Sequence, residues 1–170
     1  DPACPVVVIS YSANTYTLSN PFEAQIVSAL TLLYKKLVDA QQSGVSAQEF
    51  WTQKIGIVTP HRAQMASIRN QLVDAAGMTM DPPPFVDTVD RFQGQERDII
   101  LSSYVVADRD FVASEDAFIL SPRRFNVTLT RARSKFVMLI SNALLQYLPS
   151  DPDVARDAAH LQLFAEQYCS

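Results

Sequence analysis

The sequence predicts an α/β fold in which helices cover both faces of a mostly parallel sheet. Short apolar runs rich in β-branched residues alternate with amphipathic stretches at the spacing of βαβ units. The length of 170 residues is about that of one domain, and 48% hydrophobic with 19% charged residues is typical of globular proteins. We therefore expect residues 1–170 to form a single domain, a fragment of a longer protein because the chain opens on Asp1 and not on Met.

The first strand is expected at PVVVIS (residues 5–10), which is short, continuous and β-branched. A long helix follows. Asn20 is its candidate N-cap, Pro21 suits the first helical position, and Glu23 completes the pattern of a capping box. Gly44 marks its end. One apolar stripe of this helix is expected to face the core: Ile26, Val27, Leu30, Leu33, Tyr34, Leu37 and Val38.

The second strand is KIGIVTP (54–60), and an amphipathic helix follows it over residues 61–77. Gly77 is expected to end that helix. The three prolines of residues 82–84 then favour an extended linker. The inward-facing residues of the helix are expected to be Met65, Ile68 and Leu72.

Two further strands, FVDTV (85–89) and DIILSSYVV (98–106), flank a turn centred on Gly94. A polar loop is expected over residues 107–117. Ser121 and Pro122 again combine a cap with a first helical position, so RRFNVTLTRAR should be helical. The last strand and the last helix are expected at KFVMLIS (135–141) and at residues 151–168.

Composition excludes several classes of protein. The two cysteines lie near opposite ends of the chain, which excludes a zinc cluster built from cysteines and argues against a disulfide framework. We expect no metal site, and a reducing, intracellular and cytoplasmic setting. No apolar run approaches the ~20 residues of a membrane helix, so we expect no membrane contact. The net charge is −4, but ten of the fourteen Lys and Arg residues fall within residues 62–135, which predicts a local basic surface.

The chain has four glycines, and none is followed by Lys and then Ser or Thr. A GxxxxGK[ST] phosphate loop and a GxGxxG fingerprint are therefore both impossible. We expect that this chain alone cannot hold and hydrolyse a nucleoside triphosphate.

Three polar stretches are candidate functional segments, and we expect function at the carboxyl ends of the strands. In TVDRFQGQERD (88–98), Gly94 can adopt a positive φ and lets a ligand approach closely, while Glu96 suits a ribose hydroxyl. A solvated turn explains the segment equally well. In TPHRAQ (59–64), a hydroxyl precedes a helix N-terminus, as in phosphate sites, but ordinary strand-to-helix loops have the same composition. His61 is more simply a surface residue than a ligand.

The third stretch, SPRRFNVTLTRARSK, holds four arginines and one lysine, whereas a solvated basic face would mix Lys and Glu. On a helix Arg131 and Arg133 cannot point the same way. One of them is expected to face a nucleotide and the other a carboxylate such as Asp98 or Glu96. A domain with these arginines and no phosphate loop fits a partner that supplies an arginine finger across an interface.

Four segments resemble superfamily 1 helicases. TVDRFQGQERDIILSSYV is similar to motif V, and SPRRFNVTLTRARSKFVMLIS to motif VI. IGIVTPHRAQ and SNPFEAQIV resemble the strand–TPY–xxQ segment and the Asn-x-x-Glu-Ala helix start of this family. The segments follow the family order from residue 19 to 141. The most similar group contains the nonsense-mediated-decay RNA helicase and related DNA helicases.

This resemblance implies a RecA-like three-layer αβα sandwich, the second motor domain (2A) of a P-loop NTPase fold without its own P-loop. The whole protein would be an ATP-dependent helicase or translocase that moves 5′ to 3′ on single-stranded DNA or RNA. ATP with Mg²⁺ would be held mainly by an N-terminal RecA-like domain of the same protein, which carries the metal ligands. The isolated chain would be inactive.

The resemblance also assigns residues. Arg131 would be the catalytic arginine finger. The nucleotide-binding residues would be Gly94, Glu96, Arg133 and Gln93. The nucleic-acid-binding residues would be Thr59, Pro60, Arg62 and Thr88. Arg62 departs from the acidic or small residue that the family often has there, and Thr128 replaces an Ala of motif VI, a change that we expect to be tolerated.

A non-catalytic nucleic-acid or protein binding module is the alternative function. The combination of Glu96, Arg131 and Arg133 favours the motor, because a scaffold needs no finger. A small-molecule α/β enzyme fits poorly, since the chain has two histidines and no Ser-His-Asp order.

Overall fold

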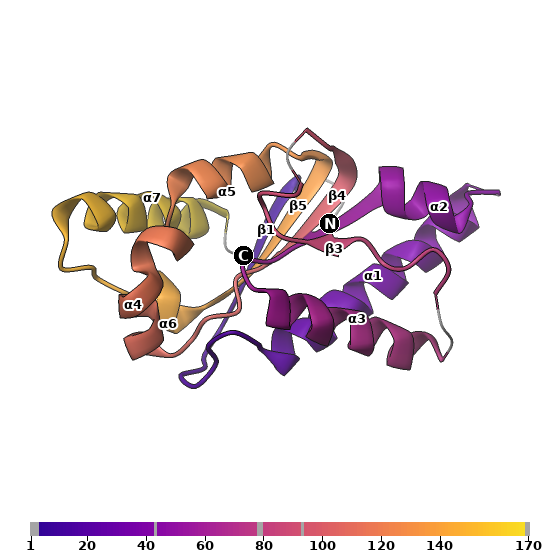
Figure 1. Ribbon diagram of the computed structural model, residues 1–170. Helices are drawn as coiled ribbons and strands as arrows, with labels where there is room; N and C mark the ends of the chain where they lie inside the picture. Colours follow the sequence, from indigo (N-terminus) through magenta and orange to yellow (C-terminus); the bar gives the residue numbers. More distant parts are fainter. Residues whose placement is uncertain (1–3, 43, 78–79, 93, 169–170) are drawn as a thin grey trace.

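Five parallel strands form the central sheet of the domain (Figure 1). The computed structural model describes residues 4–42, 44–77, 80–92 and 94–168. The strands in these residues are β1 (Val6–Tyr11), β2 (Ile55–Val58), β3 (Val86–Asp87), β4 (Arg97–Ser103) and β5 (Ala132–Ser141). Their order across the sheet is β1-β5-β4-β2-β3, so the two strands that flank Gly94 are separated by β2.

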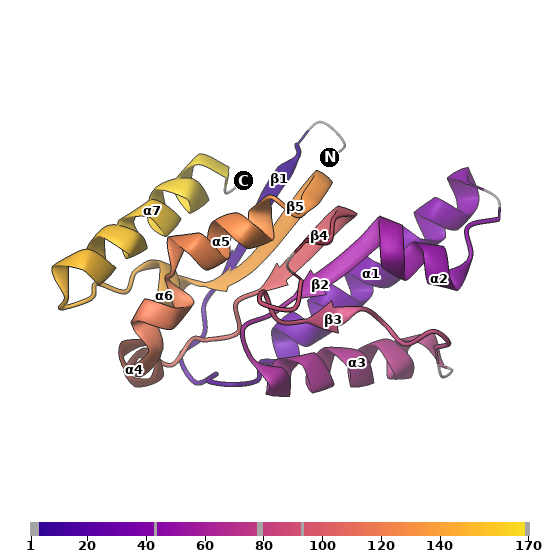
Figure 2. The same cartoon turned by 45° about the horizontal axis from the view of Figure 1, so that its top comes forward.

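Helices cover both faces of this sheet (Figure 2). They are α1 (Pro21–Gln41), α2 (Ala47–Glu49), the π-helix η1 (Phe50–Lys54), α3 (Arg62–Ala76), α4 (Arg109–Ile119), α5 (Pro122–Leu129), α6 (Asn142–Leu145) and α7 (Pro152–Tyr168). One buried apolar cluster joins α1, η1 and α3 to the sheet, and a second joins α4, α6 and α7 to its other face. The predicted α/β fold is confirmed, and two helical layers around a parallel sheet are consistent with a RecA-like sandwich. No helix in the described residues is long and apolar enough to cross a membrane.

The predicted start of α1 is partly right. Asn20 caps the helix, since its side chain accepts a hydrogen bond from the Glu23 N–H. The capping box is wrong, because the Glu23 side chain turns into the core and the Asn20 N–H donates instead to Gln64 Oε1 at 2.7 Å. Helix α1 already ends at Gln41.

Two residues of the predicted apolar stripe of α1 are not in the core. Leu33 and Leu37 are 55% and 49% exposed, so this part of the prediction is wrong. The buried face is turned toward Ala24, Val27 and Thr31, because the small residues on that side let α1 approach the sheet and α3 closely. In α3 the predicted inward face is confirmed at Ile68 and Leu72, and Gly77 ends the helix with a φ of +67°.

A buried polar network joins α1 and α3 to the end of β4. The Glu23 carboxylate is fully buried and accepts hydrogen bonds from the Tyr11 and Ser103 hydroxyls and, at 3.0 Å, from the Val105 N–H. Gln64 Nε2 donates to the Ser103 hydroxyl at 3.0 Å. Val105 has a φ of +72°, a strained value for a β-branched residue, and the network holds its backbone on both sides because the Asn20 side chain donates to its carbonyl.

Two predicted segments near the arginine-rich stretch differ from the structure. The expected polar loop over residues 107–117 is largely helix α4, whose N-cap Asp108 accepts from the Phe111 N–H at 2.8 Å. The helix expected through Arg133 ends at Leu129, and β5 begins at Ala132. It ends there because the Arg131 carbonyl accepts a hydrogen bond from the Arg97 N–H, which places the chain in the sheet.

Candidate functional site

The predicted site residues lie at two opposite sides of the sheet. We call the side where the parallel strands begin the amino edge, and the side where they end the carboxyl edge. The turn before β4 and the residues around the start of β5 bring Gly94, Glu96, Arg131 and Arg133 to the amino ends of the strands. Thr59 and Thr88 follow the ends of β2 and β3 and lie at the carboxyl ends. Function was expected at the carboxyl ends of the strands, and for the residues predicted to bind the nucleotide this placement is wrong. The length of the sheet therefore lies between the residues predicted to bind the nucleotide and those predicted to bind single-stranded nucleic acid.

Arg131 lies between α5 and β5 with its guanidinium half-exposed. Its Nε donates to the Val127 carbonyl at 3.2 Å, and its Nη2 lies 3.3 Å from the Thr130 hydroxyl. Among the described residues, no carboxylate lies within ion-pair distance of this guanidinium. A guanidinium has five N–H donors, so Arg131 retains donors for an anionic ligand.

Arg133 is held by the protein itself. Its Nη2 lies 3.0 Å from Asp98 Oδ1 and donates to the Gln53 carbonyl at 2.7 Å. The register between β4 and β5 shifts here, with two residues of β5 opposite Asp98, and such a bulge directs adjacent side chains differently. One arginine of the pair therefore meets a carboxylate, as the sequence predicted. A nucleotide contact by Arg133 stays a prediction.

The turn before β4 is exposed at Gly94, Gln95 and Glu96. Gly94 has a φ of +81°, and a Cβ built there would meet no atom within 4 Å, so the glycine is required by the backbone conformation and not by packing. Gln93, the other nucleotide residue predicted in this segment, lies outside the described residues. The turn presents its polar groups beside Arg131, because Arg97, which follows it, pairs with Ala132.

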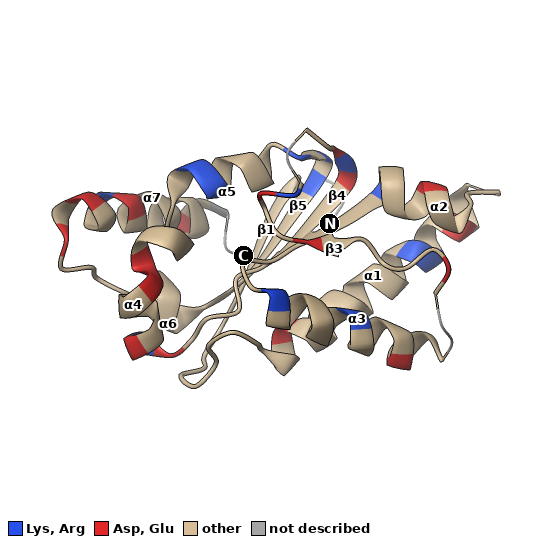
Figure 3. Ribbon diagram, in the orientation of Figure 1, with Lys and Arg blue, Asp and Glu red and all other residues tan. Residues whose placement is uncertain are grey.

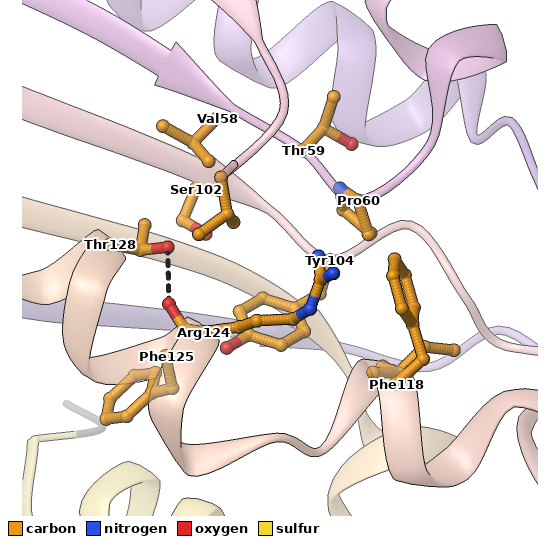
Figure 4. A pocket seen from close by; sticks show the side chains of 11 residues that line it. Val58, Thr59, Pro60, Ser102, Tyr104, Phe118, Arg124, Phe125 and Thr128 are labelled. Carbon is orange, nitrogen blue, oxygen red and sulfur yellow. Dashed lines mark hydrogen bonds between the residues drawn. The ribbon is translucent and has the colours of Figure 1, made fainter. Parts of the chain in front are cut away.

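At the carboxyl edge, the Thr59 hydroxyl faces inward. Thr59 is 1% exposed, and its Oγ1 has no hydrogen-bond partner among the described residues. It lines a cavity of about 30 Å³, together with side chains from β4, α4 and α5 (Figure 4). Its N–H donates to the Asp87 carbonyl, and the Thr88 N–H is bonded to the Asp87 carboxylate. The Thr59 hydroxyl and these two amides are therefore not available to a single-stranded nucleic acid in this structure.

Pro60 and Arg62 remain accessible at the same edge, Pro60 half-exposed and Arg62 exposed in the first turn of α3. His61 between them is only 8% exposed, so the expectation of a surface histidine is wrong. It is covered by α4, which the sequence had not predicted: the His61 ring packs against Phe111 and Phe118 with centroids 5.9 and 6.2 Å apart. Burial lowers the pKa of His61.

Lys and Arg residues lie on α5 and near the starts of β4 and β5, while Asp and Glu residues are frequent on α4 and α7 (Figure 3). Arg124 is not free for a ligand, because it pairs with Asp90 at 3.1 Å and lies over the Phe118 ring at 4.1 Å. The predicted local basic surface is therefore limited in extent. Its accessible members include Arg62, Arg91 and Arg123.

Arg97 was not among the predicted site residues, although it is 4% exposed at the start of β4 and contacts both the turn and the backbone of Arg131. An arginine directly before a buried strand, where charge is costly, was the available signal.

Comparisons with known proteins give one matching family and several relatives of this chain. A protein family described as "AAA domain" matches residues 8–143. DNA replication ATP-dependent helicase/nuclease DNA2 of Homo sapiens is 33% identical over 122 residues, 72% of this chain and 10% of the relative. Helicase SEN1 of Saccharomyces cerevisiae is 40% identical over 89 residues (52% and 4%), and helicase sen1 of Schizosaccharomyces pombe is 32% identical over 129 residues (75% and 7%). The chain spans a tenth or less of the length of these three relatives.

Proposed function

Since this chain belongs to the superfamily 1 helicases of the DNA2 and Sen1 type, we propose that it is the C-terminal motor domain of an ATP-dependent DNA or RNA helicase or translocase. In this proposal an N-terminal RecA-like domain of the same protein binds most of the ATP and its Mg²⁺. The present chain supplies an arginine finger and one side of the nucleotide site, and it does not hydrolyse ATP alone.

The observation that carries the proposal is the state of the two arginines at the amino edge. Arg133 is bound to Asp98, whereas Arg131, two residues away, has no carboxylate partner among the described residues and keeps unused donors. A guanidinium suits phosphoryl oxygens, whose negative charge it stabilises most where water is excluded. Closure of another domain onto this edge would place Arg131 against the terminal phosphate of ATP, with Gly94 and Glu96 beside the rest of the nucleotide.

The opposite edge is the proposed single-strand contact. The exposed Arg62 and the half-exposed Pro60 and Thr88 surround the N-terminus of α3 and the end of β3. Helix N-termini and arginines both favour phosphates, and contacts of this kind give affinity without sequence preference. We propose that the protein moves from 5′ to 3′ along a single strand. The test is whether it displaces a protein bound at the 3′ end faster than one bound at the 5′ end. An intracellular, cytoplasmic location is likewise proposed.

The decisive test is the strand-stimulated ATPase activity of the full-length protein with Arg131→Ala. We expect kcat to fall about a hundredfold or more while nucleotide affinity is largely kept, because a finger acts mainly on the transferring phosphoryl group. Arg156→Ala on α7 is the matched control, since this arginine is 70% exposed and pairs only with the exposed Asp153 among the described carboxylates. Absence of turnover in the wild type, or an unchanged kcat in the variant, would favour a non-catalytic binding module.

A further inference from the structure

Arg97 is a buried cation at the amino edge of the sheet. It is the first residue of β4 and only 4% exposed. In the part of the chain that the structure describes, no carboxylate pairs with it. A buried charge is retained only where other groups compensate for the lost water. The groups that contact the Arg97 guanidinium therefore indicate which segments of the chain it joins.

Each nitrogen of the Arg97 guanidinium has an acceptor. Nε donates to the Trp51 carbonyl of η1 at 2.8 Å, Nη1 to the Glu96 carbonyl at 2.9 Å, and Nη2 to Gln95 Oε1 at 2.9 Å. The guanidinium carbon lies 4.8 Å from the centre of the Phe85 ring and 5.4 Å from that of Phe92. The side chain is therefore fixed by three hydrogen bonds and by two aromatic rings, which also stabilise its charge.

The backbone of Arg97 contacts the proposed finger. Its N–H donates to the Arg131 carbonyl at 3.0 Å, and Arg97 pairs with Ala132 in the sheet. A single residue thus holds the exposed turn through its side chain and the backbone of the proposed finger through its main chain. Its other anchor, the Trp51 carbonyl, belongs to a buried residue of a π-helix, a conformation frequent at functional sites.

Only an arginine can make this set of bonds. A lysine carries its donors on one nitrogen and cannot reach three acceptors spread over two segments. The sequence also makes room for the arginine, because a Cβ at Gly56 would lie 2.6 Å from the Phe92 ring and 3.1 Å from Arg97 Cγ. The glycine in β2 therefore permits the aromatic and cationic packing beneath the turn.

We propose that Arg97 is a positioning residue for ATP hydrolysis, which fixes the turn at Gly94–Glu96 relative to the finger Arg131. The inference rests on the proposed function, since it assumes that this turn meets the nucleotide. Arg97 itself is buried and does not touch ATP. Its effect is to keep the turn and the finger in one arrangement before the other motor domain closes.

The test measures kcat and KM for ATP in the full-length protein with saturating single strand. Arg97→Lys keeps the charge but cannot make all three side-chain hydrogen bonds. We therefore expect KM to rise about tenfold and kcat to fall about tenfold. Gln95→Leu removes one of the three acceptors of Arg97 at an exposed position, and we expect KM to rise about threefold. Arg156→Met, at a 70% exposed arginine of α7 that has no place in the proposed site, should leave both constants unchanged.

Loss of folded protein lowers the apparent kcat but leaves KM unchanged, so the KM values separate positioning from stability. Wild-type KM in both Arg97→Lys and Gln95→Leu would overturn the inference, as would a lower kcat that merely follows a lower melting temperature. Arg131→Ala in the same assay tells the two proposals apart. If it leaves kcat unchanged, the proposed function fails; if kcat falls a hundredfold while the Arg97 and Gln95 variants match the wild type, only the inference fails.

Discussion

Raising the pH from 5 to 8 is predicted to destabilise the fold through Glu23. The carboxyl group is fully buried, and burial raises its pKa from 4.5 to about 7, although hydrogen bonds from Ser103, Tyr11 and the Val105 N–H favour the charged form. The unfolded chain releases this proton near pH 4.5, whereas the folded chain keeps it until about pH 7. Stability from this group is therefore complete below pH 4.5 and is lost as the pH rises to about 7.

The size of the effect follows from the two pKa values of Glu23. The rise from 4.5 to about 7 corresponds to about 3 kcal/mol, at about 1.4 kcal/mol per pKa unit. At about pH 8 and above the group is ionised in both states, and its contribution no longer changes. The loss is large beside the total stability of about 5–15 kcal/mol of an ordinary domain.

Urea unfolding of the chain at pH 5, 6, 7 and 8 measures this loss. In Glu23→Gln the group cannot ionise, so between pH 5 and 8 the free energy of unfolding of the wild type should fall by up to about 3 kcal/mol relative to the variant. The amide also loses an acceptor, which shifts the variant's stability at every pH and leaves the pH dependence as the readout. Glu166→Gln, at an exposed carboxylate of α7, is the control and should follow the wild type. If the difference in unfolding free energy between Glu23→Gln and the wild type is the same at all four pH values, the pKa of Glu23 is not raised by folding.

Three further substitutions test the packing. Gly56→Ala should lower the free energy of unfolding by about 1–3 kcal/mol, because its Cβ would lie 2.6 Å from the Phe92 ring; equal stability in urea would contradict that geometry. Thr128→Ala removes a hydrogen bond of 2.9 Å to the Arg124 carbonyl, so a thermal melt should show the free energy of unfolding lower by about 1 kcal/mol. The ATPase activity of the full-length protein should be retained. Loss of that activity would assign Thr128 a role beyond packing. Leu33→Gln should change stability by less than about 0.5 kcal/mol, because Leu33 is 55% exposed; a larger loss in urea unfolding would show that this face of α1 is covered.

The fold could be predicted where local pattern decides structure. The buried strands are nearly continuous apolar runs because both faces of the sheet are covered, as at Ile55–Val58, and such runs are visible in the sequence. Asn20 and Gly77 were also predictable, since a cap depends on residues within one helical turn. Helix α4 was missed because its polar residues suggested a loop, although Asp108 is a good cap and Val112 and Ile119 share one helical face.

The site could be predicted only in part, because its partners are distant in the sequence. The types and spacing of residues indicated that Arg131 and Arg133 have different partners. The end of α5 at Leu129 depends on a backbone bond between Arg97 and Arg131, which no local pattern reveals. The contact between Arg97 and the Trp51 carbonyl spans 46 positions. Glu23 has a capping-box position, but two of its hydrogen-bond partners, Ser103 and Val105, lie 80 and 82 positions away.

The central claim is that Arg131 is the finger at a nucleotide site shared with another domain. The most direct measurement is a structure of the full-length protein with ADP, Mg²⁺ and aluminium fluoride, which mimics the transferring phosphoryl group. We expect the Arg131 guanidinium to lie about 2.7–3.0 Å from the fluoride group, with Arg133 still bound to Asp98. The assignment of Arg131 as the finger would be contradicted if its side chain stayed bonded to the Val127 carbonyl. In that case either Arg133 or no arginine of this chain would contact the fluoride.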